Sequence, residues 1–96
     1  YAGTKAAQEN MVRNLAKQVA EWGVTVNNLA PGVIDTDRNV KYLSDPDYRH
    51  RVMDGIPVDF IGEPVDCLGA ALLLCSEAGR YITGVDIRVD GGMGLP

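Results

Sequence analysis

A tyrosine and a lysine stand four residues apart at the start of the chain, in the run Tyr1-Ala2-Gly3-Thr4-Lys5. On a helix, this spacing places both side chains on one face, with Cβ atoms about 5–6 Å apart. A free tyrosine titrates near pH ~10, and a neighbouring positive charge favours its phenolate. The pair therefore has the chemistry of a proton donor and acceptor for carbonyl–alcohol interconversion. By itself the signal is weak, because an ordinary amphipathic helix start with a solvated lysine has the same spacing.

The composition indicates a single small folded domain. The 96 residues are 46% hydrophobic and 23% charged, which is typical of a globular protein. The net charge of −4 argues against general binding to nucleic acid or to an anionic membrane. No apolar run reaches the ~20 residues of a membrane span, and no secretory signal is visible. We therefore expect a cytoplasmic protein without nucleic-acid or membrane partners.

The two cysteines, Cys67 and Cys75, fall on one helical pattern. In a continuous helix their Cα atoms would lie about 12 Å apart, which excludes a disulfide between them. We interpret both as buried free thiols; a redox or metal role is the alternative. Because His50 is the sole histidine, a zinc site of cysteines and histidines is poorly supported, and we expect no metal.

The hydrophobic pattern predicts helix, strand, long excursion, helix and strand, in that order. Residues 1–22 have a helical apolar stripe that a glycine ends, and residues 24–30 form a β-branched strand before a Pro-Gly pair. The stripe consists of Met11, Leu15, Val19 and Trp22, widened by Val12 and Ala16. These residues are either core or an interface.

The second half of the chain carries the excursion and the second helix–strand pair. Residues 33–62 are irregular, with one short helix over 47–53, and excursions of this length are usually functional. Residues 63–79 are predicted to be a helix that has Pro64 in its first turn. A turn over 81–84 leads into an alternating strand over 85–89.

The order of the elements implies a right-handed parallel strand–helix–strand unit. A parallel sheet of two strands is a poor fold by itself, because parallel strands need both faces covered. The first strand would also leave an apolar edge open, formed by Val24, Val26 and Leu29. We therefore expect residues 1–96 to be the C-terminal part of a larger α/β sheet, with further chain before Tyr1.

Six short segments, in their order and spacing, resemble the short-chain dehydrogenase/reductase family. They are residues 1–5, 24–27, 30–36, 62–64, 81–84 and 89–92. The resemblance covers essentially the whole chain. It implies a doubly wound Rossmann-type parallel sheet that binds NAD or NADP. Residues 1–96 would form the C-terminal part of that single domain, without its N-terminal nucleotide-binding half.

The resemblance assigns the reacting groups to Tyr1 and Lys5, which would also contact the cofactor. Tyr1 would be the catalytic acid and base. The charge of Lys5 would lower the pKa of this tyrosine, and its ammonium would hydrogen-bond the nicotinamide ribose. The family's catalytic serine, its central-strand asparagine and its glycine-rich phosphate loop have no counterpart in residues 1–96.

The resemblance also assigns a cofactor-binding segment that comprises Pro31, Gly32, Val33, Ile34 and Thr36. It follows the first strand, at the edge where open α/β sheets bind their ligands. The amide of Ile34 would meet the nicotinamide carboxamide, and the hydroxyl of Thr36 would contact the nicotinamide end or the phosphates. An ordinary turn at Pro31-Gly32 is the alternative for that pair, and Thr36 also suits the N-cap of a following short helix.

Residues 37–56 correspond to the family's variable substrate-binding loop, which often orders on ligand binding. Its polar side chains either bind a polar or acidic substrate or face the solvent, and His50 has no visible partner. The 89–92 run corresponds to a structural turn. Where relatives often have Gly-Arg-x-Gly, this chain has Asp59-Phe60-Ile61-Gly62, so that no arginine is available there.

The expected function is an NAD(P)-dependent oxidoreductase that acts on a secondary alcohol or ketone. The polar loop favours a sugar, polyol or sugar acid as the small-molecule substrate, and a 3-oxoacyl-[acyl-carrier-protein] reductase is the alternative. We expect a homo-oligomer, a dimer or tetramer. The 96 residues by themselves would be incomplete and inactive, and a non-catalytic self-associating fragment is the alternative of another class.

Overall fold

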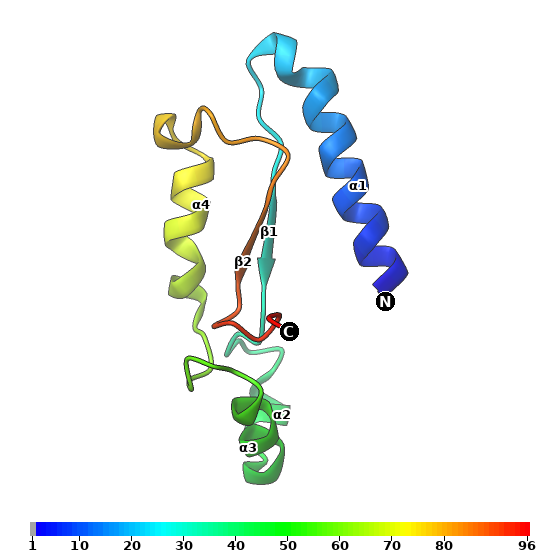
Figure 1. The fold of residues 1–96 in the computed structure, drawn as a ribbon. Coiled ribbons are helices and arrows are strands. Elements are labelled where there is room, and N and C mark those ends of the chain that lie inside the picture. Colours follow the sequence, from blue (N-terminus) through cyan, green and yellow to red (C-terminus); the bar gives the residue numbers. More distant parts are fainter. Residues whose placement is uncertain (1) are drawn as a thin grey trace. The chain divides into compact units, whose positions relative to one another are not determined.

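The chain alternates helices and strands in the predicted order (Figure 1). The computed structural model describes residues 2–96, so that Tyr1 lies outside the described part. The longer elements are α1 (Ala2–Val19), β1 (Asn28–Pro31), α2 (Val40–Leu43), α3 (Pro46–Asp54), α4 (Leu68–Leu74) and β2 (Asp86–Val89). Short 3₁₀ helices are η1 (Ala20–Trp22), η2 (Pro64–Cys67) and η3 (Glu77–Gly79).

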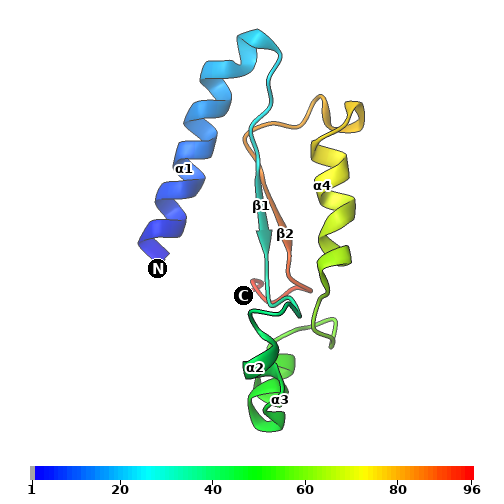
Figure 2. The same cartoon turned by 180° about the vertical axis from the view of Figure 1, so that it is seen from behind.

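The chain forms two compact units. Residues up to Leu29 and residues 70–87 make the first unit, and residues 30–69 and 88–96 make the second. Both strands therefore begin in the first unit and end in the second. In the first unit, α1 lies on one side of the strands and the body of α4 on the other, as Figures 1 and 2 show. Helices on both sides of a parallel strand pair are the expected α/β arrangement.

Helix α1 ends as predicted, and it buries only part of the expected apolar stripe. The chain continues through η1 to Gly23, whose φ of 72° suits a left-handed C-cap. The buried residue is Ala16, with 3% of its surface exposed, whereas Met11 is 63% exposed and Trp22 is 71% exposed. Within this chain Met11, Leu15 and Trp22 are therefore surface residues, so the core alternative fails for these three and the interface alternative stays a prediction.

The two strands pair in parallel, as the order of elements implies. Asn28 donates its N–H to the carbonyl of Val85 at 2.9 Å, and Gly32 donates to Val89 at 3.0 Å, so that the register advances in the same direction along both strands. Strand β1 is shorter than predicted, because residues 24–27 lie outside it. The parallel pair itself is confirmed.

Just before β1, side-chain hydrogen bonds supplement a single backbone bond, from the N–H of Gly84 to the carbonyl of Val26 at 2.8 Å. Asn27 donates Nδ2–H to the carbonyl of Ile82 at 3.1 Å and accepts the N–H of Val85 on Oδ1 at 3.2 Å. The N–H of Val26 is bound by the hydroxyl of Thr83 at 3.1 Å. These bonds hold the 81–84 turn against the start of the strand, so the backbone there needs no regular ladder.

We expect Asn27→Ala to lower the free energy of unfolding by about 1–3 kcal/mol. The substitution would remove both side-chain bonds and leave the Ile82 carbonyl and the Val85 N–H unpaired. Urea unfolding of the two proteins measures the difference. Asn28→Ala is the matched control, since Asn28 accepts one long bond from Gln8 at 3.4 Å. Equal losses for both variants would show that Asn27 has no special role.

The second unit has its own apolar cluster. Leu43 and Ile56 are each 4% exposed and Ile61 is 7% exposed. Partly buried residues pack around them, namely Val33, Val52, Met53 and Met93. The predicted helix over 47–53 is confirmed as α3, and a further short helix, α2, precedes it. Asp45 caps α3 by accepting the N–H of Asp47 at 3.0 Å, with Pro46 in the first turn.

The predicted helix over 63–79 is divided into three pieces, η2, α4 and η3. Gly79 is buried because the chain turns back there, and a Cβ at this position would meet the backbone of Leu73. Cys67 and Cys75 are free thiols, as expected. Cys75 is exposed, however, so the expectation of a buried thiol is wrong at this position. Within this chain the face of α4 that carries Leu72 is also exposed, at 58% for that residue.

Asp59 is strained, since it is the sole non-glycine residue in the described range with positive φ, at 65°. We expect Asp59→Gly to raise the free energy of unfolding by about 0.5–1 kcal/mol, because glycine adopts this conformation freely. Thermal and urea unfolding measure the gain. Asp37→Gly is the control, because Asp37 is exposed and has no positive φ. A gain as large at position 37 would contradict this explanation.

Candidate active site

The predicted cofactor segment begins at the carboxyl end of β1. Pro31 is the last residue of the strand and is exposed, whereas Gly32, Val33, Ile34 and Thr36 are half-buried. A Cβ on Gly32 would lie 2.6 Å from the Cβ of Asp90 and 2.8 Å from its Cα. Glycine is therefore required here by the close approach of the residue after β2. The carboxyl edge of a parallel sheet is where ligands bind in open α/β folds.

Ile34 forms an isolated parallel bridge with Gly62. The N–H of Gly62 binds the carbonyl of Val33 at 3.3 Å, and its carbonyl accepts the N–H of Asp35 at 2.7 Å. Both bonds use the peptide groups on either side of Ile34. In extended backbone, the N–H and carbonyl of Ile34 itself therefore point to the opposite side.

Of the two backbone groups of Ile34, the carbonyl is hydrogen-bonded within the chain and the N–H is not. Its carbonyl accepts a hydrogen bond from Nδ2 of Asn39 at 2.8 Å. Its N–H has no hydrogen-bond partner among residues 2–96. A backbone donor without a partner in the chain is available to a ligand. The role that the resemblance gives this amide, binding of a carboxamide oxygen, needs such a donor and stays a prediction.

Thr36 follows this amide and does not cap a helix. Its carbonyl accepts the N–H of Asn39 at 2.9 Å in a turn, and α2 begins later, at Val40 with Asn39 as N-cap. The N-cap alternative for Thr36 is therefore wrong. Among the residues that the structure describes, its hydroxyl makes no hydrogen bond. The hydroxyl of Thr36 is thus a second polar group available to a ligand.

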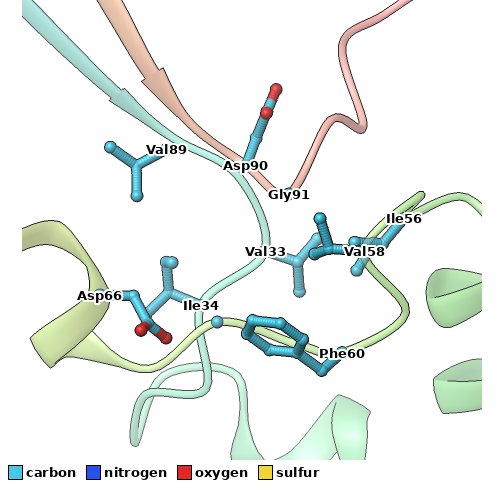
Figure 3. Close-up of a pocket in the computed structure, with 10 residues that line it drawn as sticks. Val33, Ile34, Ile56, Val58, Phe60, Asp66, Val89, Asp90 and Gly91 are labelled. Carbon is cyan, nitrogen blue, oxygen red and sulfur yellow. The ribbon is translucent and has the colours of Figure 1, made fainter.

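An apolar cavity of about 210 Å³ lies beside this segment (Figure 3). Figure 3 shows Val33, Ile34 and Phe60 grouped around it, with the carboxylate of Asp90 directed away. The remaining residues come from the 56–66 segment and the end of β2, namely Ile56, Val58, Gly62, Asp66, Val89 and Gly91. Such a cavity suits a flat apolar group with a few polar contacts at its rim.

The carboxylates near this cavity have structural partners. Oδ2 of Asp66 accepts the N–H of Glu63 at 2.7 Å, as part of the capping box of η2. Asp90 accepts the N–H groups of Gly92 and Gly94 at 2.9 and 3.0 Å. The 89–92 run therefore forms a turn held by its own aspartate, which agrees with the structural role expected for it.

Sequence reasoning missed several residues of the site. Phe60, Val58 and Asp66 line the cavity, and Asn39 holds the carbonyl of Ile34. One of them carried a local signal: Asp66 has the spacing of a capping box with Glu63, beside the proline in the first turn. No local signal points to Asn39 or Phe60, because their contacts depend on the bridge between Ile34 and Gly62.

The loop over 37–56 is folded rather than irregular, and it carries an aromatic pair. The rings of Tyr42 and Tyr48 lie 6.2 Å apart and are tilted by 52°, and the guanidinium of Arg51 lies 5.9 Å from the Tyr48 ring. His50 has a partner after all, since its Nε2 lies 3.6 Å from the carboxylate of Asp54. Both side chains are largely exposed, so this pair contributes little to stability.

A second cavity, of about 160 Å³, is lined by residues of this loop and of the predicted cofactor segment. It is lined by Gly32, Val33, Asn39, Tyr42, Leu43 and Tyr48. Val33 therefore borders both this cavity and the apolar one. The arrangement places phenol and amide groups next to residues that the sequence assigns to cofactor binding.

The predicted catalytic pair is only partly described. Tyr1 lies outside the described residues, and Lys5 is half-buried on α1 in the first unit. The described range contains no group of three His, Cys, Asp or Glu side chains that could hold a metal ion. Across residues 2–96, none of the helices combines the length and the apolar composition needed to cross a membrane.

Comparison with known proteins identifies the family. A family model described as enoyl-(acyl carrier protein) reductase matches residues 1–94. The chain is 38% identical over 95 residues to 3β-hydroxysteroid dehydrogenase 1 of Eggerthella lenta, covering 99% of this chain and 36% of the relative. It is 37% identical to L-rhamnose 1-dehydrogenase (NAD(P)(+)) of Azotobacter vinelandii, covering 97% and 36%. The 3-oxoacyl-[acyl-carrier-protein] reductase of Vibrio harveyi is 40% identical, with coverage of 97% and 37%.

Solved structures show the same fold. A 4-hydroxyisoleucine dehydrogenase complexed with NADH matches with a TM-score of 0.93 at 27% identity, covering 100% of this chain and 40% of that one. A hydroxysteroid dehydrogenase from Escherichia coli matches with a TM-score of 0.88 at 37% identity, covering 96% and 38%. The chain belongs to the short-chain dehydrogenase/reductase family. It spans about 36% of the length of the curated relatives named first above.

Proposed function

We propose that the protein carrying this chain is an oxidoreductase that uses NAD or NADP to interconvert a secondary alcohol and a ketone. The observation that carries the proposal is the donor pair at the carboxyl end of β1. The amide of Ile34 and the hydroxyl of Thr36 have no partners among residues 2–96, and Ile34 lines the apolar cavity. Relatives whose names include NADH or NAD(P)(+) support this reading.

The proposed roles of the residues follow from these positions. The cofactor, when bound, supplies or accepts a hydride. The backbone of residues 31–34 and the hydroxyl of Thr36 hold its nicotinamide end, and the cavity wall excludes water. Tyr1 gives a proton to the carbonyl oxygen in reduction and takes the hydroxyl proton in oxidation. Lys5 stabilises the phenolate of Tyr1 and binds the nicotinamide ribose.

The proposed organisation places residues 1–96 in the C-terminal part of one Rossmann-type domain. The donors on Ile34 and Thr36 would then supply one portion of the cofactor site, and residues before Tyr1 the rest. A homo-oligomer, dimer or tetramer, is part of the same proposal. The share of about 36% of the relatives' length supports a longer functional protein.

For the substrate we propose a sugar, polyol or sugar acid. The Tyr42–Tyr48 pair and the amide of Asn39 line a small cavity, and such groups suit hydroxyl-rich molecules. The cavity of about 160 Å³ is smaller than the pockets of about 300–1,000 Å³ that hold drug-sized ligands. L-rhamnose 1-dehydrogenase among the relatives supports this class. A 3-oxoacyl thioester is the second candidate, supported by the relative from Vibrio harveyi.

The test is a cofactor titration followed by a substrate panel. NADH and NADPH fluorescence is titrated with the full-length protein, and absorbance at the reduced-nicotinamide band then follows turnover. The panel pairs sugars, polyols and sugar acids with 3-oxoacyl thioesters and hydroxysteroids at matched concentrations. We expect binding of one cofactor and the highest kcat/KM for a polyhydroxylated substrate. Failure to bind either cofactor would contradict the proposed function, and a higher kcat/KM for the thioester would favour the second candidate.

The chain taken alone supports a second proposal, which is self-association. Several large apolar side chains are exposed in it, among them Trp22 at 71%, Val65 at 63% and Leu72 at 58%. We propose that the isolated 96-residue chain is inactive and oligomerises through such surfaces. Sedimentation velocity over a concentration series tests this proposal. A monomer at every concentration, or turnover of NAD(P)H by the isolated chain, would contradict it.

A further inference from the structure

Asn39 ties the predicted cofactor segment to the start of α2. Its Nδ2 donates to the carbonyl of Ile34 at 2.8 Å in a partly buried position. Its backbone N–H binds the carbonyl of Thr36 at 2.9 Å, and its own carbonyl accepts the N–H of Leu43 at 2.9 Å. One residue thus contacts both ends of the 34–36 segment and the first turn of the substrate loop. None of the six family motifs in the sequence includes it.

The hydrogen bond from Asn39 reaches Ile34 on the same side as the N–H of Ile34, which has no partner among residues 2–96. The bridge to Gly62 uses the peptides on either side of Ile34, so the N–H and carbonyl of Ile34 share the opposite side. Asn39 therefore approaches on the side where the N–H of Ile34 is available. Fixing the carbonyl of Ile34 fixes the orientation of that residue and, with it, the direction of the donor.

We propose that Asn39 is a positioning residue for the nicotinamide end of the cofactor, acting through the amide of Ile34. The proposal rests on the function proposed above. Asn39 holds Ile34 so that its N–H is already directed at the carboxamide oxygen before the cofactor binds. A prealigned donor binds more tightly because less conformational freedom is lost on binding. Asn39 is also the N-cap residue of α2 and lines the cavity with Tyr42 and Tyr48, so the same contact links order in the 37–56 loop to cofactor binding.

The decisive comparison uses NADH and ADP-ribose, which lacks the nicotinamide, as ligands of the full-length protein. Asn39→Asp keeps the size of the side chain but replaces the Nδ2 donor by an oxygen that repels the carbonyl of Ile34. We expect the Kd for NADH to rise about 3–10-fold, as for the loss of one neutral hydrogen bond. The Kd for ADP-ribose is expected to change less than about twofold. The added negative charge affects both ligands through their shared diphosphate, so the ratio of the two Kd values cancels it.

Two further variants separate positioning from general loosening of the loop. Ser44→Ala removes the bond from Oγ of Ser44 to the carbonyl of Lys41, which is 2.8 Å long and lies at the other end of α2. It leaves Ile34 untouched, so both affinities are expected to stay within about twofold of the original. Asn39→Ser restores a donor, and we expect it to recover part of the lost NADH affinity. The ¹⁵N–¹H shift of Ile34 is expected to change with Asn39→Asp and not with Ser44→Ala.

The outcomes distinguish this inference from the proposed function. If the original protein binds neither NADH nor ADP-ribose, the proposed function fails and the inference with it. If the original protein binds both and Asn39→Asp weakens both equally, or neither, the inference alone is overturned. Should Asn39→Asp fail to fold, Asn39→Ser and Asn39→Ala carry the same comparison. If Asn39→Ser and Asn39→Ala bound NADH equally well, the proposed role of a side-chain donor at position 39 would be overturned.

Discussion

Tyr1→Phe in the full-length protein is expected to lower kcat by about 10²–10⁴-fold, the usual contribution of a positioned acid or base. Phenylalanine keeps the ring and removes only the hydroxyl that exchanges the proton. The affinity for NAD(P)H is expected to change much less, because in the proposed site the backbone and hydroxyl of residues 31–36 hold the nicotinamide end. Steady-state turnover with the best substrate of the panel measures the first effect, and fluorescence titration measures the second.

Tyr81→Phe is the matched control for this prediction. Tyr81 is 99% exposed in the turn before β2, so loss of its hydroxyl should leave turnover within about twofold of the original. Circular dichroism and thermal unfolding of both variants verify that they are folded. Turnover by Tyr1→Phe equal to that of the control would remove Tyr1 from the proposed chemistry. An equal loss of cofactor binding and turnover would instead indicate damage to the cofactor site.

The elements that the sequence predicted best are those with local signals. Helix α1 ends near Gly23, whose positive φ only glycine adopts without strain, and α3 begins with an aspartate cap and a proline. Both signals lie within a few residues of the boundary that they define. The order of elements then fixed the parallel pairing of β1 and β2, because a helical crossover leaves no other simple arrangement.

The errors occurred where distant segments decide the structure. Residues 24–27 have a strand-like pattern, but Asn27 and Thr83 bind the backbone there through their side chains. The pairing of two segments more than 50 residues apart cannot be derived from the apolar pattern of either one. The same limit applies to α1, where Ala16 is buried against the 83–84 turn while the larger Met11 and Trp22 are exposed. Apolar spacing identifies a helix face but not the segment that will cover it.

The sequence predicted chain positions for the candidate site, but it carried no signal for the orientation of the backbone groups there. The Pro-Gly pair after β1 marks the ligand edge of the sheet. The direction of the Ile34 amide, in contrast, depends on a bridge to Gly62, and its carbonyl is held by Asn39. A single peptide flip would leave the sequence motif unchanged and remove the donor. In the proposed site, the motif therefore indicates the residues, and the bridge determines which of their backbone atoms are available to a ligand.

Gly32→Ala is expected to lower the free energy of unfolding by about 2–3 kcal/mol, through overpacking and a lost strand bond. The new Cβ would lie 2.6 Å from the Cβ of Asp90 and 2.8 Å from its Cα. Asp90 cannot easily withdraw, because its carboxylate holds the N–H groups of Gly92 and Gly94. The strands would separate instead, at the bond from the N–H of Gly32 to the carbonyl of Val89. Urea unfolding measures the loss.

Gly69→Ala provides the matched comparison, since a Cβ at this position of α4 meets nothing within 4 Å. Alanine is the better helix former, so we expect this variant to gain about 0.5–1 kcal/mol. Both substitutions reduce the conformational freedom of the unfolded chain by a similar amount. The difference between the two variants therefore measures the native-state contact at Gly32 and the helix preference at Gly69. If Gly32→Ala were as stable as Gly69→Ala, the close approach of β1 and Asp90 would not constrain the cofactor segment, and the orientation of Ile34 would need another cause.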